Sequence, residues 1–172
     1  MNPSAASGKE GGVRVVVRGE RRIPEKIRVL AAMDDADYSD LCTVTTGGTR
    51  RSAEEWARTV VERVAGARAQ FVWRVILGLR LEPRSAPGCI GGWRIADRGE
   101  GWVRCEARSW GTTAHILCYV DDRQVSVAVF ARFDRPLAAM VFAPVGFGHR
   151  LVIPAMLHRA VREEQRRGPH PD

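Results

Sequence analysis

The chain has 172 residues with 27 basic and 20 acidic side chains, and its formal net charge is +7. Hydrophobic residues make up 45% of the sequence and charged residues 27%, which excludes a disordered or fibrous protein and predicts one folded domain. Lys9 and Lys26 are the only lysines, and the other 25 basic residues are arginines. This bias fits anion recognition or a GC-rich coding sequence, and the spread of the arginines along the chain favours the second.

The two ends of the chain differ in composition from the middle. Residues 1–12 are mostly Ser, Gly and Ala, so we expect a flexible tail there, one domain over residues 13–168 and a short tail over 169–172. The longest apolar stretch, residues 137–148, has 12 residues, whereas a membrane-spanning helix needs about 20. With no signal peptide and no paired cysteines, we expect a cytoplasmic protein without a membrane span and with reduced Cys side chains.

Basic and apolar residues alternate over residues 13–28. An edge strand followed by a solvated turn explains this pattern, because Arg and Lys commonly protect the edges of sheets. A nucleic-acid-binding arm is the alternative, but acidic residues are interleaved and no aromatic side chain precedes Tyr38 to stack on bases. We therefore expect no nucleic-acid partner, and a different partner for residues 9–28 stays open.

One strand and two short helices are predicted in the next part of the chain. Residues 38–46 have the β-branched content of a strand. Ser52 and Glu55 have the spacing of a capping box, which predicts a helix over residues 53–65. The apolar spacing predicts a second helix over residues 67–77.

Short β-rich runs follow, joined by tight polar turns that favour hairpins. The runs are residues 89–96, 102–110, 112–120 and 124–133. Four consecutive runs with such turns predict an antiparallel meander.

The last part of the chain, residues 136–167, returns to a helical period. Pro144 and Pro154 lie inside it, and each removes an amide donor and clashes with the preceding turn. We therefore predict a kinked helix, or two helices that meet near residues 146–148.

The order of these elements predicts an α+β fold, in which a curved antiparallel sheet has two short helices after the first strand and a long C-terminal helix enclosing a cavity. Several strings add a family resemblance: Leu77-Gly78-Leu79-Arg80-Leu81, Gly92-Trp93-Arg94-Ile95, Glu106 with Ser109-Trp110 and Ala114-His115, Arg132-Phe133-Asp134-Arg135-Pro136, and His149-Arg150 with Pro154. Over residues 37–163 the chain resembles an actinobacterial family of unknown function near the START, polyketide-cyclase and birch-pollen-allergen superfamily (SRPBCC). The resemblance implies the helix-grip fold.

The meander places one carboxylate near one histidine. If Trp110 and Gly111 form the turn, Glu106 lies opposite His115. Contact with the carboxylate would raise the pKa of His115 and orient it as a general base. The alternatives are a structural pair on the solvent side of the sheet, or a turn one residue later that pairs Arg108 with His115.

Small residues on the apolar face of the meander leave room for a cavity against the kinked helix. Large aromatic side chains, including Phe142, fill this space in the alternative interpretation. The residues expected to line the cavity are Trp93, Trp110, Cys105, Cys118, Phe130 and Met140. His149 and Arg150 interrupt the apolar helix, so they either meet solvent at a kink or point into the cavity, where Arg150 would hold an anionic group.

We therefore expect a protein that binds a small apolar or amphipathic ligand between the sheet and the C-terminal helix. An enzyme of the same architecture is the alternative: a cyclase, aromatase or dehydratase acting on a polyketide-like carbonyl compound, with His115, Glu106 and His149 as its catalytic residues. No metal or nucleotide motif is present in the sequence, so no cofactor and no metal are expected. The identity of the ligand and the oligomeric state stay open.

Overall fold

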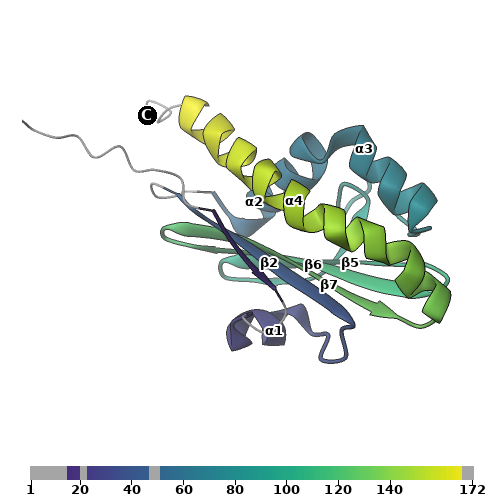
Figure 1. The fold of residues 1–172 in the computed structure, drawn as a ribbon. Coiled ribbons are helices and arrows are strands. Elements are labelled where there is room, and N and C mark those ends of the chain that lie inside the picture. The colour runs from purple at the N-terminus through teal and green to yellow at the C-terminus, as the bar shows by residue number, and fades with distance from the viewer. Residues whose placement is uncertain (1–14, 20–22, 47–50, 168–172) are drawn as a thin grey trace, which may run out of the picture.

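The computed structural model describes residues 15–19, 23–46 and 51–167, and it has an α+β fold built on one antiparallel sheet (Figure 1). In chain order the elements are β1 (Val15–Gly19), α1 (Glu25–Ala31), β2 (Tyr38–Thr45), α2 (Ala53–Arg58), the π-helical η2 (Thr59–Val64), α3 (Gly66–Phe71), the π-helical η3 (Val72–Ile76), β3 (Cys89–Ile90), β4 (Trp93–Gly99), β5 (Trp102–Arg108), β6 (Thr112–Asp121), β7 (Gln124–Phe133) and α4 (Pro136–Arg167). The seven strands lie in the order β1-β2-β7-β6-β5-β4-β3, and all neighbours are antiparallel.

Helices cover both faces of the sheet. Figure 1 shows α4 and the helices from α2 to η3 on one side, which we call the inner face, and α1 on the other, the outer face. Side chains alternate between the two faces, so that on β7 Val127 and Val129 pack inward while Ala128 and Phe130 pack outward. The larger core, which includes Trp56, lies between the inner face and its helices.

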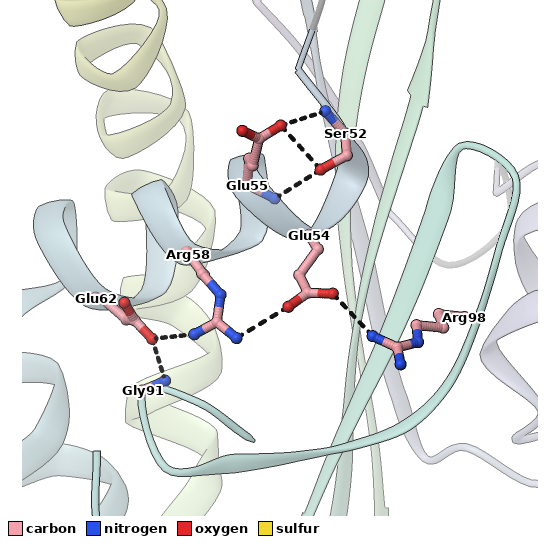
Figure 2. Close-up of polar contacts among 7 residues, drawn as sticks. All are labelled: Ser52, Glu54, Glu55, Arg58, Glu62, Gly91 and Arg98. Atoms are coloured by element: carbon pink, nitrogen blue, oxygen red, sulfur yellow. Dashed lines mark hydrogen bonds and ion pairs between the residues drawn. The ribbon is translucent and has the colours of Figure 1, made fainter. Parts of the chain in front are cut away.

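The predicted capping box begins α2 (Figure 2). The Ser52 hydroxyl accepts a hydrogen bond from the Glu55 amide at 3.2 Å, and the Glu55 carboxylate accepts one from the Ser52 amide at 2.8 Å. The two bonds satisfy amides that the first turn of a helix leaves without intrahelical partners. Ser52 therefore fixes where the inner helical layer starts.

A chain of ion pairs ties this helix to the sheet (Figure 2). The guanidinium of Arg58 contacts the carboxylates of Glu54 and Glu62 at 2.9 and 3.1 Å. Glu54 also pairs with Arg98 of β4, and Glu62 accepts a hydrogen bond from the Gly91 amide at 2.9 Å. These contacts orient α2 and η2 over the β3–β4 end of the inner face.

Most of the predicted elements are confirmed. The strand predicted over residues 38–46 is β2, the two short helices run through α2–η2 and α3–η3, and the meander contains β3 to β7. Gly91 and Gly92, at φ +57° and +92°, divide the first predicted run into β3 and β4. Gly is required at these positions because other side chains rarely adopt positive φ.

The segment over residues 13–28 differs from its prediction. Its first part forms β1, an edge strand as expected. The predicted solvated turn is instead α1, which begins after Pro24 and buries Ile27 and Ala31 against the outer face. A helix of seven residues is too short to show a clear apolar period. Residues 1–14, 20–22 and 168–172, which include both predicted tails, lie outside the described residues.

The predicted kinked helix is α4, a continuous helix whose two arms are bent by 41° around residue 151. The bend lies after the expected position near residues 146–148. Pro154 explains it, because a proline ring clashes with the carbonyl four residues earlier, here that of Arg150. No single helix in the described part of the chain has the length and apolarity needed to cross a membrane, and only the two bent arms together reach them.

Candidate functional site

Polar side chains gather where β2 faces the middle of α4. Alternation along β2 turns Tyr38 and Asp40 to the same side as Cys42 and Val44, which belong to the inner core. Asp40 is only 4% exposed. We call Tyr38, Asp40, His149 and Arg150 the inner polar cluster.

The Tyr38 hydroxyl links β2 to α4 within this cluster. It lies 2.6 Å from Asp40 Oδ2 and 3.2 Å from the carbonyl oxygen of Gly146, and it can donate to either acceptor. A Cβ atom at position 146 would lie 3.1 Å from the rings of both Tyr38 and Phe142. Glycine at this position therefore lets the phenol approach the helix backbone.

The other side of the cluster comes from α4. The ring of His149 packs edge-on against Phe142 with centroids 6.1 Å apart, and the Arg150 guanidinium lies 5.9 Å from the centroid of the Tyr38 ring. Asp40 interacts electrostatically with both His149 and Arg150. The carboxylate, the imidazole and the guanidinium thus belong to one electrostatic unit between sheet and helix.

Two buried polar atoms of the cluster make no hydrogen bond within the described residues: Asp40 Oδ1 and His149 Nδ1. Almost all buried polar atoms in folded proteins are hydrogen-bonded, since leaving one unbonded costs about 1–3 kcal/mol. Thr46 Oγ1, Trp93 Nε1 and Arg104 Nε are likewise buried without a partner in the described residues. Asp40 Oδ1 and His149 Nδ1 differ from these because they lie on the two sides of one layer, between β2 and α4.

Burial shifts the ionisation of the cluster in opposite directions. Desolvation raises the pKa of Asp40, although the Tyr38 hydrogen bond, the nearby His149 and Arg150, and a backbone hydrogen bond from Val129 lower it in part. Desolvation also lowers the pKa of His149, against the influence of Asp40. The proton affinities of the acid and the base thereby approach each other, which is the condition for proton transfer between them.

The predicted pair of Glu106 and His115 forms on the outer face. The register confirms that these two residues are opposite each other. His115 Nδ1 lies 2.8 Å from the carbonyl oxygen of Ala31, the last residue of α1, and its Nε2 lies 3.8 Å from Glu106 Oε2. Glu106 also pairs with Arg94. The pair joins α1 to the sheet. It therefore fits the alternative interpretation, a structural pair on the side of the sheet away from α4.

The expected rise in the pKa of His115 is wrong. Burial lowers the pKa, and the charges of Arg104, Arg108 and Arg132 lower it further, while the bond to the Ala31 carbonyl acts in the opposite direction. Two of these arginines lie on β5 and one on β7, and their charges add to the effect of burial. His115 is therefore a neutral, hydrogen-bonded histidine at ordinary pH.

The three predicted catalytic residues do not form one site. His149 lies between the sheet and α4, whereas His115 and Glu106 lie on the opposite face. The sheet itself separates the two groups, so no single substrate can touch both.

The predicted ligand-binding residues are also divided. Trp93, Cys105 and Cys118 are buried in the inner core, between the sheet and its helices. Phe130 belongs to the outer core and cannot line a space facing α4, because its position on β7 turns it toward α1. Trp110 is 48% exposed in the β5–β6 turn and Met140 is 71% exposed on α4.

Two cavities have linings that are fully described, and neither lies between the sheet and α4. One, of about 270 Å³, is an outer-face groove beside α1, lined by residues that include Lys26, Thr43 and Tyr119. The other, of about 290 Å³, lies beside Arg80, Glu106 and nearby residues. Within the described residues no group of three His, Cys, Asp or Glu side chains is arranged to hold a metal ion.

Sequence reasoning identified the helix side of the inner polar cluster and missed the strand side. His149 and Arg150 stand out because they interrupt an apolar helix, whereas Tyr38 and Asp40 lie at the polar start of the predicted strand. The signal for Asp40 was its place two residues before Cys42 and four before Val44, on the same face of a buried strand.

Comparison of the chain with family models, curated proteins and solved structures finds no match. Any proposal for the function therefore rests on the fold class and on the inner polar cluster.

Proposed function

We propose that the protein binds a small amphipathic molecule between the inner face of the sheet and α4. The polar head of the ligand lies at the inner polar cluster, and its apolar part follows the inner face. One observation carries the proposal: Asp40 Oδ1 and His149 Nδ1 are buried without hydrogen bonds on opposite sides of the same layer.

A ligand with a donor and an acceptor satisfies both atoms at once. Each bond made to a buried unbonded atom recovers about 1–3 kcal/mol, so two of them favour a bound state strongly. Arg150 adds a positive charge beside the cluster, which suits a carboxyl or carbonyl head. The small side chains of Cys105 and Cys118 on the inner face suit an apolar tail.

This proposal includes the helix-grip fold. The seven-stranded antiparallel sheet with α4 along its inner face supports that architecture. In such an arrangement α4 holds the ligand against the sheet, and the bend at residue 151 controls how closely its two arms approach the strands.

Native mass spectrometry of freshly purified protein tests the proposal first, because a co-purifying molecule identifies the ligand. Titration with a dansyl-labelled fatty acid then locates the site. Asp40→Asn and His149→Gln are expected to weaken binding by about tenfold each, since each removes one polar contact. Asp122→Asn on the β6–β7 turn and His158→Gln on α4 are matched controls and keep wild-type affinity. Binding that no inner-cluster variant changes would disprove the site.

An enzyme is the second candidate, favoured by the raised pKa of Asp40 beside the lowered pKa of His149. In a dehydration, His149 takes a proton from the carbon next to a carbonyl, and Asp40, in its protonated form, gives its proton to the departing hydroxyl. Water leaves as the carbon–carbon double bond forms, and the proton on His149 returns to Asp40. This sequence balances without a further reactant.

The two candidates are separated by incubation with a β-hydroxyacyl thioester, followed by mass spectrometry for loss of water. Turnover that Asp40→Asn and His149→Gln each abolish supports the enzyme. Tight binding of the fatty acid probe without any turnover supports the binding protein and excludes the dehydratase.

A further inference from the structure

The solvent side of the inner helical layer is unusually apolar. Nine large hydrophobic side chains are exposed in the described part of the chain, and seven of them lie on α3, η3 and α4. The seven are Phe71, Val75, Ile76, Leu137, Met140, Phe147 and Val152. A soluble surface tolerates single exposed apolar residues, whereas a group on one layer marks a contact with something else.

The exposed residues of α4 follow one side of the helix. Leu137, Met140 and Phe147 recur at spacings of three and seven residues, which return to the same face, and Met140 and Phe147 are 71% and 70% exposed. Phe142 and His149 occupy the opposite side and face the sheet. The helix is therefore apolar on both sides, and only one of these sides has a partner in the described fold.

Charge along the stretches that carry these apolar side chains is positive. Residues 63–76 and 135–162 contain no Asp or Glu and seven arginines. All seven arginines are exposed: Arg63, Arg68, Arg74, Arg135, Arg150, Arg159 and Arg162. Helix α1, on the other side of the sheet, differs because it mixes Glu25 with Lys26 and Arg28. Within these two stretches the exposed apolar side chains are thus bordered by positive charge, and acidic residues adjoin the stretches in the chain, including Glu62 of η2 and Glu163 and Glu164 near the end of α4.

We propose that this surface, formed by the seven exposed apolar side chains and their bordering arginines, docks on an anionic lipid membrane. The apolar side chains enter the interface, while the arginines contact lipid phosphates and attract the negative surface. The protein lies on the membrane and does not cross it. Apart from Arg150, which also belongs to the inner polar cluster, the surface uses side chains that do not take part in the ligand site.

Charge complementarity selects this partner. A second copy docked through the same surface would bring two sets of arginines together without acidic partners. A nucleic acid would satisfy the arginines but would leave exposed Leu, Met, Val and Ile side chains against its phosphates and sugars. Anionic lipid satisfies both the charge and the apolar side chains.

Flotation with lipid vesicles tests the proposal. Wild-type protein is expected to float with vesicles containing phosphatidylglycerol, more weakly as salt is raised, and to bind vesicles of pure phosphatidylcholine at least about tenfold less. The double variant Met140→Ser/Phe147→Ser is expected to lose at least about tenfold in affinity, because both side chains would enter the interface. Val29→Ser, an equally exposed apolar site on α1, is the matched control and keeps wild-type binding.

A charge variant completes the test. Arg68→Gln/Arg162→Gln removes two bordering arginines and is expected to weaken binding to phosphatidylglycerol vesicles by at least about tenfold, whereas Arg123→Gln on the β6–β7 turn leaves it unchanged. Circular dichroism verifies that each variant is folded. Failure to float, equal binding to both vesicle types, or full binding by the folded double variant would overturn the proposal. Self-association or DNA binding that the double variant abolishes, without lipid binding, would assign the surface to a different partner.

Discussion

A histidine meets a carboxylate on both faces of the sheet, and the two pairs differ in how completely their polar atoms are bonded. On the outer face His115 bonds to the Ala31 carbonyl at 2.8 Å and lies beside Glu106, which Arg94 also contacts. On the inner face, Asp40 and His149 each keep one buried atom without a hydrogen bond in the described residues. The same residue types therefore make a structural contact on the outer face and form a candidate binding site on the inner face.

This difference shows that proximity of acid and base is a weak guide to function. The strand register singles out Glu106 and His115, yet His115 bonds to the Ala31 carbonyl and holds α1 on the sheet, while Glu106 pairs with Arg94 of β4. Atoms whose bonding capacity is unused are the better indicator, because their cost must be offset by a partner.

The largest expected effects come from one phenylalanine on each face. Phe130→Ala in the outer core and Phe142→Ala in the inner core should each reduce the free energy of unfolding by about 3–5 kcal/mol, because both rings are almost fully buried. Urea unfolding measures both. A much smaller loss at Phe142 would show that the inner layer is loosely packed and would strengthen the case for ligand space there.

The two histidines should respond with different signs. His115→Leu leaves the Ala31 carbonyl without its partner and should reduce the free energy of unfolding by about 1–3 kcal/mol. His149→Leu removes a buried atom that has no hydrogen bond. The free energy of unfolding of this variant should therefore stay unchanged or rise by up to about 1 kcal/mol. Equal losses in urea unfolding at both sites would contradict the contrast between the faces.

Asp40→Asn should stabilise the protein while weakening ligand binding. The amide occupies the same space without the cost of burying a charge, and a gain of about 1 kcal/mol in the free energy of unfolding is expected near neutral pH. The raised pKa of Asp40 means that its contribution to stability is present at low pH and is lost as the pH rises through that pKa. The gain of the variant should therefore shrink in acid, which thermal unfolding at several pH values can measure.

The histidines make stability depend on pH in the opposite direction. Both have pKa values below the ordinary 6.5, so the unfolded chain binds more protons than the folded one as the pH falls below about 6.5. Stability should be full above this pH and should decline below it. Thermal unfolding between about pH 8 and 5 measures the slope. His149→Leu should make the slope shallower, and a slope that neither histidine variant changes would refute the assignment.

The smallest effect is expected at the rim of the outer pair. Arg94→Ala removes the ion pair to Glu106, but the arginine side chain is largely solvent-exposed, so the loss should be below about 1 kcal/mol and should vanish in high salt. Urea unfolding at two salt concentrations tests this. A larger loss would mean that Glu106 depends on Arg94 to support His115.

Much of the fold followed from local sequence rules. The β5–β6 register came from one turn at Trp110 and Gly111, and the start of α2 came from the Ser52 capping box. The bend in α4 came from its prolines, although steric contact from Pro154 places it later than the glycines suggested. These features depend on a few neighbouring residues, which is why they could be predicted.

It was harder to predict which face of the sheet each strand side chain points to. Strands β6 and β7 are buried on both sides because α1 covers the outer face, so apolar alternation could not tell which way Phe130 points. The missing helix was therefore the cause of the wrong assignment. Asp40 was overlooked for a related reason, since its burial depends on α4, more than 100 residues later in the chain.

The three cysteines of the inner core can report how often the helical layer opens away from the sheet. Cys42, Cys105 and Cys118 lie on three different strands under the helical layer, and none is paired in a disulfide. Burial raises the pKa of Cys42 and Cys105 to about 12, so in the closed protein they are neutral thiols shielded from reagents that attack thiolates. Alkylation of each thiol therefore reports how often the helices lift from its strand, and the order of alkylation maps where the layer opens first.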